Sequence, residues 1–335
     1  MKRIQMAHGG GGRLMHQLLR EHIAAVFGED TIRHDGAVLS GVALDGALVL
    51  TTDASVVTPL FFPGGDLGQL AVYGTVNDLA VTGARPLALS LALVLEEGLP
   101  LETLDRLLVS AKAAADAAGV SIVTGDTKVV ERGRCDGVYA ATTGVGCRLP
   151  GVDIDARRVR QGDRILLSGD IGRHGVAVLS AREGLTFGGA VSSDCAPLVA
   201  PILELLGAAP STPFLRDCTR GGAAAVLHEL ARAAGVELSV DEAAVPVSEP
   251  VRGACEILGL EPMSLACEGR FLAVVSPDAV EASLALLRAH PQCAGAVVVG
   301  VVGPPTPGGA VWLNTAFGQQ RPLDYPSGEH LPRIC

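Results

Sequence analysis

The stretch DLGQLAVYGTVNDLAVTGA, residues 66–84, predicts a helix with Asp66 as its N-cap, and the apolar stretch LALSLALVL, residues 87–95, follows it as a strand. Before this helix, ALVLTTD at residues 47–53 is typical of a buried strand that ends in an acid. Aromatic residues make up only 3% of the chain, and small aliphatic residues dominate its apolar part. A core of small side chains suits closely packed layers of helix on sheet.

The rest of the chain extends this pattern into two mixed domains of an α+β protein. A length of 335 residues exceeds the size at which one core usually stops growing, so we expect domains at 1–150 and 151–318. In the first domain, helices are predicted at 13–27 and 101–118, and strands at 120–126 and 136–149. In the second, helices are predicted near 173–183, 195–206, 221–234 and 278–289, and strands at 164–170, 236–240, 270–276, 295–302 and 310–314.

The last stretch, GQQRPLDYPSGEHLPRIC at residues 318–335, has three prolines and no periodicity. We therefore expect a flexible tail over 319–335 that ends in Cys335. The sixteen residues after Gln319 would reach at most about 50 Å when extended, and roughly 20 Å on average as a coil.

Composition excludes several classes of protein. No stretch of 18 uncharged apolar residues occurs, and no apolar region precedes the N-terminal glycines, so we expect a cytoplasmic protein without a membrane segment. The net charge of −10 argues against nucleic-acid binding. The eight cysteines have no C-x-x-C spacing, and we expect most of them to be small buried side chains.

Four acids lie beside small residues at the ends of apolar segments, namely Asp35, Asp53, Asp78 and Asp126. A single such acid is usually a helix cap or turn residue, but four in one domain favour a site for a hard cation. Mg²⁺ usually shares one or two carboxylates with substrate phosphates, so ATP is the expected partner. The chain has no G-x-x-x-x-G-K-[ST] motif, so the nucleotide must be held in another way than by a P-loop.

Two glycine-containing stretches could hold phosphates through exposed backbone N–H groups. One is the run His8, Gly9, Gly10, Gly11 and Gly12, although such a run is more often a disordered extension. The other is RDCTRGG, which combines Asp217, Thr219 and Arg220 with a predicted helix start. Lys128 could neutralise a phosphoryl group or be a solvated surface residue, and Glu268 could be a base or lie at a surface turn.

The chain ends in PRIC, and a free thiol at the most mobile point of a chain is a liability. The sequence is not a prenylation box, because that requires three residues after the cysteine. Cys335 is thus either an accidental thiol or a residue with a chemical role.

Seven motifs together resemble the HypE family of hydrogenase maturation proteins over nearly the whole chain, in order. They are AHGGGGRLM (7–15), TPLFFPGGDL (58–67), GTVNDLAVTGA (74–84), LEEGLP (95–100), VTGDTKVV (123–130), RDCTRGG (216–222) and the terminal PRIC. The terminal motif separates this family from the related aminoimidazole ribotide synthetases, selenophosphate synthetases and thiamine monophosphate kinases. Within RDCTRGG, Cys218 stands where the family more often has Ala or Pro.

The resemblance implies two domains of the aminoimidazole ribotide synthetase-like type in a homodimer whose first-domain sheets join, with ATP at the domain interface. It also implies that Cys335 receives a carbamoyl group from a HypF-like carbamoyltransferase. ATP-dependent dehydration would then give a thiocyanate, whose cyanide passes to iron on a HypC–HypD-like complex for the [NiFe]-hydrogenase centre.

The resemblance also implies roles for single residues. Asp53, Asp78 and Asp126, with Asp35 nearby, would hold Mg²⁺, while Cys335, Lys128 and Glu268 would carry the chemistry. The set expected to hold the nucleotide consists of the His8–Gly12 run, Asp35, Asn77, Thr127, Asp217, Thr219 and Arg220. Glu268 is the candidate base because a carboxylate accepts protons at neutral pH, but Lys128 remains an alternative if its pKa is depressed.

Two other functions stay open at this point. A superfamily relative that phosphorylates a small molecule, such as a thiamine phosphate or selenide, would not need its tail. A carrier protein that only ferries a group on its cysteine would not hydrolyse ATP.

Overall fold

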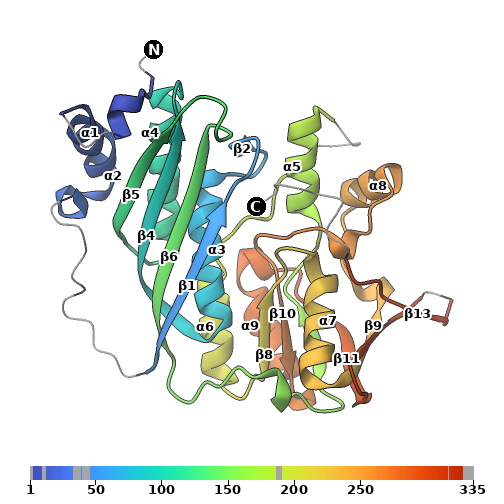
Figure 1. Cartoon of the computed structure of the whole chain (residues 1–335). Helices are drawn as coiled ribbons and strands as arrows, with labels where there is room; N and C mark the ends of the chain where they lie inside the picture. Colours follow the sequence, from blue (N-terminus) through green and yellow to red (C-terminus); the bar gives the residue numbers. More distant parts are fainter. Residues whose placement is uncertain are drawn as a thin grey trace.

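The computed structural model describes residues 3–9, 13–32, 39, 46–185, 191–315 and 317–326. These residues form two mixed domains that lie side by side, with the first domain at the left of Figure 1. The last strand of the first sheet ends at Arg148, and the first strand of the second sheet begins at Arg164.

The first domain is a four-stranded sheet with the order β1-β6-β4-β5. Its strands are β1 (Leu48–Ser55), β4 (Ala84–Glu96), β5 (Ile122–Val130) and β6 (Val138–Arg148). Only β4 and β5 run parallel. The helices α3 (Leu67–Val81) and α4 (Leu101–Ala117) cover one face of this sheet (Figure 1).

Helix α3 begins as predicted, because the Asp66 carboxylate accepts the backbone N–H of Gln69 at 3.0 Å. Ser110 of α4 donates to the same carboxylate at 2.7 Å and so ties the two helices together. They approach closely at Gly68, where an added Cβ would lie 2.5 Å from the carbonyl oxygen of Leu107. The strand that follows α3 begins at Ala84, three residues before the predicted start.

The N-terminal segment is helical over the predicted range but is not one regular helix. It consists of η1 (Met6–Gly9), α1 (Arg13–Leu18), the π-helical turn η2 (Leu19–Ala24), α2 (Ala25–Phe27) and η3 (Glu29–Ile32). Figure 1 places this segment beside the edge strand β5. A two-stranded hairpin of β2 (Phe61–Phe62) and β3 (Gly65–Asp66) leads into α3.

The second domain is a seven-stranded sheet with the order β13-β12-β9-β11-β7-β10-β8. Its strands are β7 (Arg164–Leu167), β8 (Phe214–Asp217), β9 (Val236–Asp241), β10 (Phe271–Val275), β11 (Val297–Pro305), β12 (Ala310–Asn314) and β13 (Gln320–Pro322). Its α-helices are α5 (Arg173–Glu183), α6 (Val199–Ala208), α7 (Gly222–Ala234), α8 (Glu249–Leu258) and α9 (Val280–Arg288). Short 3₁₀ turns lie at η4 (Ala156–Arg158), η5 (Glu242–Ala244), η6 (Pro262–Ser264), η7 (Pro277–Ala279) and η8 (Pro291–Cys293).

Two strands and one helix of the second domain were not predicted, nor was the β2–β3 hairpin of the first. Strand β8 is only four residues long, whereas helix α8 has the sequence signals of a helix, with Glu249 and Pro250 in its first turn and Gly259 just after its end. Strand β13 corrects the expectation of a flexible tail from residue 319, because it pairs with β12 and is followed by Leu323, which is only 4% exposed. Residues 327–335, with Cys335, lie outside the described residues.

One hydrophobic core continues from the first domain into the second. Every residue of α3 except Gln69 and Asp78 is buried, as expected for a helix that is apolar on all sides. One side of α3 packs on its own sheet and on α4, and another contacts α6 and β8 of the second domain. The relative placement of the two domains is therefore set along α3 (Figure 1).

Most cysteines in the described part of the chain are buried, as the composition predicted. Six of the seven are buried, and Cys195 is partly buried. No helix among the described residues is long and apolar enough to cross a membrane.

We predict that Gly68→Ala destabilises the protein by about 1–3 kcal/mol, because its new Cβ must push α3 away from backbone atoms of α4. Gly207→Ala is the matched control, since no atom lies within 4 Å of a Cβ added at that helical position. Denaturant unfolding of both variants measures the difference. Equal stability of the two variants would contradict the close approach of α3 and α4.

Candidate active site

Glu268 lies in the turn before β10, at the seam between the two domains, and is 4% exposed. Its Oε1 atom has no hydrogen-bond partner among the described residues. Burial raises the pKa of this carboxyl well above its ordinary value, and the nearby carboxylates of Asp217, Asp194, Asp53 and Asp78 raise it further. A buried acid with a free oxygen is a candidate for proton transfer.

Three predicted acids gather near Glu268 from different elements. Asp53 is on β1 and faces α3, since a Cβ at Gly74 would lie 2.6 Å from its Oδ2 atom. Asp78 is one turn further along α3, where its Oδ2 accepts the Thr51 hydroxyl at 3.0 Å. Asp217 ends β8 and stands opposite Phe271 of β10, three residues after Glu268. The two domains thus supply two acids each.

The acids raise one another's pKa values. For Asp78, burial is the main cause and the charge of Asp53 adds to it, while the Thr51 hydrogen bond and the charges of Arg216 and Arg220 act in the opposite direction. For Asp217, burial and then the charges of Asp78 and Asp53 raise the pKa to about 7. Such a concentration of negative charge is stabilised by cations, and it favours a ligand that brings them.

The start of α7 brings the RDCTRGG motif to the same place. Gly221, the N-cap of α7, has φ of 76°, and the backbone N–H of Gly222 donates to the Thr219 carbonyl at 2.9 Å. Arg220 is exposed at this turn. Pro326 lies directly beside it, because a Cβ at Gly221 would be 3.7 Å from the Pro326 Cγ.

The C-terminal segment is anchored just before Pro326. His228 of α7 contacts the carbonyl oxygen of Leu323 through Nε2 at 3.0 Å, and its ring packs edge-on against Tyr325 at 5.0 Å. The last described residues therefore lie next to α7, whose N-cap Gly221 comes four residues after Asp217.

Asp126, Thr127 and Lys128 lie together on β5. Lys128 Nζ donates to Asp126 Oδ1 at 2.6 Å, and this hydrogen bond lowers the pKa of Asp126 despite some desolvation. Both side chains are exposed, whereas Thr127 is 4% exposed. Gly9 packs on the same strand, because a Cβ there would lie 3.0 Å from the backbone nitrogen of Val129.

A cavity of about 620 Å³ opens beside this strand. It is lined by Met15, Leu19, Ile23, Phe27, Thr31, Leu91, Leu93, Leu108, Ile122, Thr124, Gly125, Asp126 and Thr127. The N-terminal helical segment and β5 thus border a space with a mixed lining, in which apolar side chains face Thr124, Asp126 and Thr127 of β5.

The predicted site residues therefore form two groups. Asp53 and Asp78 are close to Asp217 and Glu268, but Asp126 and Lys128 are on the opposite edge of the sheet, with β6 and β4 between β1 and β5. Three strand spacings correspond to about 14 Å, too far for one cation to bind acids of both groups within one chain. Asp35, Gly10, Gly11, Gly12 and Cys335 lie outside the described residues.

Asn77 has a different environment from the one expected for a nucleotide ligand. Its side-chain amide is 2% exposed and makes hydrogen bonds with the backbone of Ala196 and Leu198 in the second domain. The contact spans the seam between the domains.

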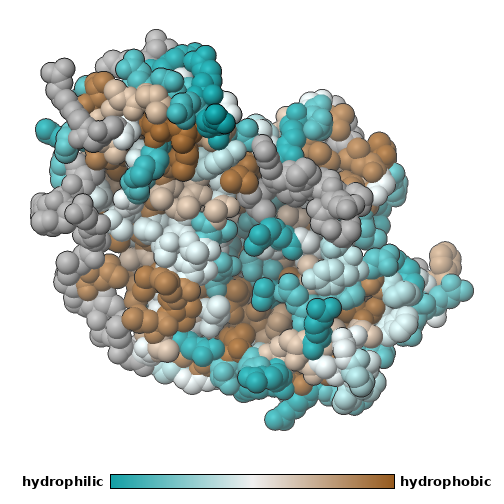
Figure 2. Space-filling model, viewed as in Figure 1, coloured by the Kyte–Doolittle hydropathy of each residue, from teal (hydrophilic) through white to brown (hydrophobic). Residues whose placement is uncertain are grey.

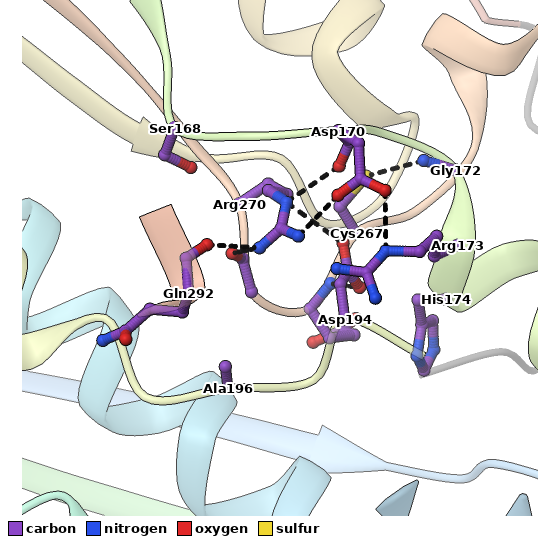
Figure 3. A network of polar contacts seen from close by, with 12 residues as sticks. Ser168, Asp170, Gly172, Arg173, His174, Asp194, Ala196, Cys267, Arg270 and Gln292 are labelled. Carbon is purple, nitrogen blue, oxygen red and sulfur yellow. Dashed lines mark hydrogen bonds and ion pairs between the residues drawn. The ribbon is translucent and has the colours of Figure 1, made fainter. Parts of the chain in front are cut away.

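A network of charged residues around Arg270, two residues after Glu268, was not anticipated from the sequence (Figure 3). Arg270 is 4% exposed and donates to Asp170 Oδ1 at 2.7 Å, while its Nε lies 3.9 Å from Asp194 Oδ2. Asp170 also pairs with Arg173 at 2.8 Å. Arg270 could have been noticed as a charge that begins an apolar strand, but Asp194 stands in a loop without periodicity.

The acids at the domain seam suit Mg²⁺ only if a nucleotide supplies further oxygen ligands. Among the described residues, no three His, Cys, Asp or Glu side chains are close enough to form a metal site by themselves. Carboxylate oxygens on Asp53 and Asp78 are nevertheless the hard ligands that Mg²⁺ takes together with phosphate oxygens.

Comparison with known proteins identifies both domains. The family models for the N-terminal and C-terminal domains of AIR synthase related proteins match residues 33–147 and 160–312. Carbamoyl dehydratase HypE of Azotobacter vinelandii is 48% identical over 99% of this chain and 97% of its own length. Carbamoyl dehydratase HypE of Escherichia coli K12 is 44% identical over the full length of both chains.

Solved structures agree with this grouping. The hydrogenase maturation protein HypE in complex with ATP superposes with a TM-score of 0.93 at 42% identity, over 98% of this chain and 99% of that one. HypE from a HypE–HypF complex superposes with a TM-score of 0.80 at 41% identity, over 94% of this chain and all of that one. A thiamine-monophosphate kinase of Stenotrophomonas maltophilia, at 21% identity and a TM-score of 0.65, shares the fold.

The raised pKa of Asp217 predicts a pH dependence of stability in metal-free and nucleotide-free protein. The unfolded chain releases this proton near pH 3.8, whereas the folded chain keeps it until about pH 7. Stability should therefore fall as the pH rises from about 4 to 7. Asp217→Asn removes this effect, so the variant should exceed the wild type in stability above pH 7, by at most about 4 kcal/mol, and the difference should shrink towards pH 4.

Chemical unfolding at several pH values measures this difference, with Asp278→Asn as the control because Asp278 is exposed. A constant difference between Asp217→Asn and wild type at every pH would show that Asp217 titrates normally.

Proposed function

Because the chain belongs to the HypE family of carbamoyl dehydratases, whose members use ATP, we propose that it dehydrates an S-carboxamide on its own Cys335 to a thiocyanate. The observation that carries this proposal is the position of Pro326 beside Gly221, at the start of the helix that follows Asp217. Nine residues remain after Pro326, and they can span at most about 30 Å. Cys335 can therefore reach the acids at the domain seam and also extend away from them.

The reaction needs ATP because the oxygen of an amide is a poor leaving group. Transfer of the γ-phosphoryl group to the carboxamide oxygen makes a C–O–P link, and loss of one N–H proton accompanies it. Loss of the second N–H proton then expels phosphate and leaves the S–C≡N group, with ADP as the other product. Mg²⁺ held by Asp53 and Asp78 would screen the phosphates when bound.

Glu268 is the better candidate for the base. It is buried at the seam with a free Oε1 atom, and its raised pKa makes it a stronger proton acceptor once ionised. Lys128 donates to Asp126, as an ammonium group does, which suits it to stabilising phosphate charge instead.

We assign the β5 group to the same reaction through a homodimer. The edge strand β1 exposes Leu48 and Leu50, at 60% and 71%, and apolar residues cover this part of the sheet in Figure 2. An exposed apolar edge is a surface on which sheets pair. A second copy whose β5 pairs with β1 would place Asp126 and Lys128 of one chain near Asp53 and Asp78 of the other, whereas pairing of β1 with β1 would keep them four strand spacings apart.

Partners follow from the chemistry of the family. A solved complex joins HypE to HypF, and we propose a HypF-like carbamoyltransferase as the source of the carbamoyl group. The cyanide of the thiocyanate would pass to iron on a HypC–HypD-like scaffold and so to a [NiFe]-hydrogenase centre. Six of the seven described cysteines are buried, as small apolar side chains are in a reducing compartment, so we place these steps in the cytoplasm.

The tether predicts a strict dependence on length. Deleting residues 327–330 should stop conversion of carbamoylated Cys335 to thiocyanate, since it shortens the maximum reach by roughly 13 Å. Replacing the same four residues by Gly-Ser-Gly-Ser is the matched control and should retain the wild-type rate. Single-turnover conversion is the measurement, with ATP affinity checked in parallel. A deletion variant that reacts as fast as the control would rule out a tether that must reach inward.

The shared site predicts complementation between inactive chains. Asp53→Asn and Asp126→Asn should each be inactive alone, but a mixture that exchanges subunits should recover about a quarter of the wild-type activity, because one site of each mixed dimer is intact. Activity after refolding the two variants together is the readout. No recovery, although mixed dimers form, would place both acids in sites made by a single chain.

A further inference from the structure

Asn77 stands next to Asp78 on α3, and its side chain is fixed by the second domain. Its Nδ2 donates to the Ala196 carbonyl at 3.1 Å, and its Oδ1 accepts the backbone N–H of Leu198 at 2.7 Å. An amide that both donates to and accepts from one backbone loop defines the distance and the orientation of that loop. The loop over residues 194–198 is therefore fastened to α3 at the position beside a candidate metal ligand.

The same loop holds the main chain of Glu268 on both sides. Asp194 Oδ1 accepts the backbone N–H of Glu268 at 3.0 Å, and the backbone N–H of Ala196 donates to the Glu268 carbonyl at 3.3 Å. The approach is very close, because a Cβ at Gly269 would lie 1.9 Å from the Asp194 carbonyl oxygen. Figure 3 shows Asp194 and Ala196 on this loop, beneath Arg270.

The far side of the loop is held by the second domain itself. Gln292 Nε2 donates to the Pro197 carbonyl at 3.1 Å, and Arg270 Nη1 donates to the Gln292 carbonyl at 2.9 Å. Arg270 also lies 3.9 Å from Asp194 Oδ2. Asn77 holds the loop from the side of the first domain, so it links the position of Glu268 to α3.

We propose that Asn77 is a positioning residue that acts through the 194–198 loop to hold Glu268 at a fixed place relative to Asp78. This inference rests on the proposed role of Glu268 in proton transfer. It replaces the sequence-based expectation that Asn77 binds the nucleotide. A base must lie within hydrogen-bond reach of the proton it removes, and a displacement of about 1 Å can cost a factor of about 100 in rate.

A double-mutant cycle on the full-length protein tests the inference. The rate of single-turnover dehydration of carbamoylated Cys335 is measured for wild type, Asn77→Ala, Glu268→Gln and the double variant. We expect Asn77→Ala to slow the wild type by about 10- to 100-fold, but to slow the Glu268→Gln protein by less than about threefold, because the group it positions is already lost. ATP affinity, measured by calorimetry, should stay within about twofold.

Three results would overturn the inference. An equal loss of rate from Asn77→Ala in both backgrounds would mean that Asn77 acts independently of Glu268. A tenfold loss of ATP affinity would restore Asn77 as a nucleotide ligand. A wild-type rate for Glu268→Gln would show that Glu268 is not the base. It would contradict that part of the proposed function, whereas the tether prediction would still be tested by its own measurement.

Two further variants separate positioning from loss of folding. Gln292→Ala releases the same loop from its other side and should also slow dehydration in a way that depends on Glu268, even if Asn77→Ala does not fold. Asn314→Ala is the matched control, because Asn314 donates to Ser239 within the second sheet and is remote from the loop. Equal slowing by Asn314→Ala would attribute the effects to general destabilisation.

Discussion

The burial of α3 on both sides is the constraint on which the site depends. The helix is covered by its own sheet and α4 in one direction and by the second domain in the other, and Asp78 is one of its two residues that are not buried. A helix enclosed in this way cannot shift without exposing apolar surface in two domains. Its polar end is therefore a rigid platform that presents Asp78 to the acids of the second domain.

Holding these acids in fixed positions close together has an electrostatic cost. Four carboxyl groups with few nearby cations cannot all be ionised in a buried place, and the raised pKa values of Asp78, Asp217 and Glu268 reflect this. A nucleotide that binds together with cations relieves this repulsion. The protein is therefore less stable without its ligand, and the relief of repulsion favours binding. The acid that stays most buried, Glu268, is then available for proton transfer near the substrate.

Much of this arrangement could be predicted from sequence where local chemistry is distinctive. Asp66 can be predicted as an N-cap because the hydrogen bond of a cap joins residues only three positions apart. The burial of α3 can be predicted because the helix is apolar on every side. Strand β13 could not be seen, because it exists only through pairing with β12 and burial of Leu323. The separation of Asp53 from Asp126 depends on strand order, and the role of Asp194 depends on a loop with no pattern, so neither can be read from spacing along the chain.

The central claim is that Cys335 is the substrate of its own chain, and the mass of the C-terminal peptide tests it most directly. The peptide is followed after the protein is incubated with a HypF-like partner and carbamoyl phosphate, and then with ATP and Mg²⁺. The account predicts a gain of one carboxamide group on Cys335, followed by the loss of one water only when ATP is present. A Cys335 peptide that stays unmodified while ATP is consumed, or a carboxamide that never loses water, would contradict it.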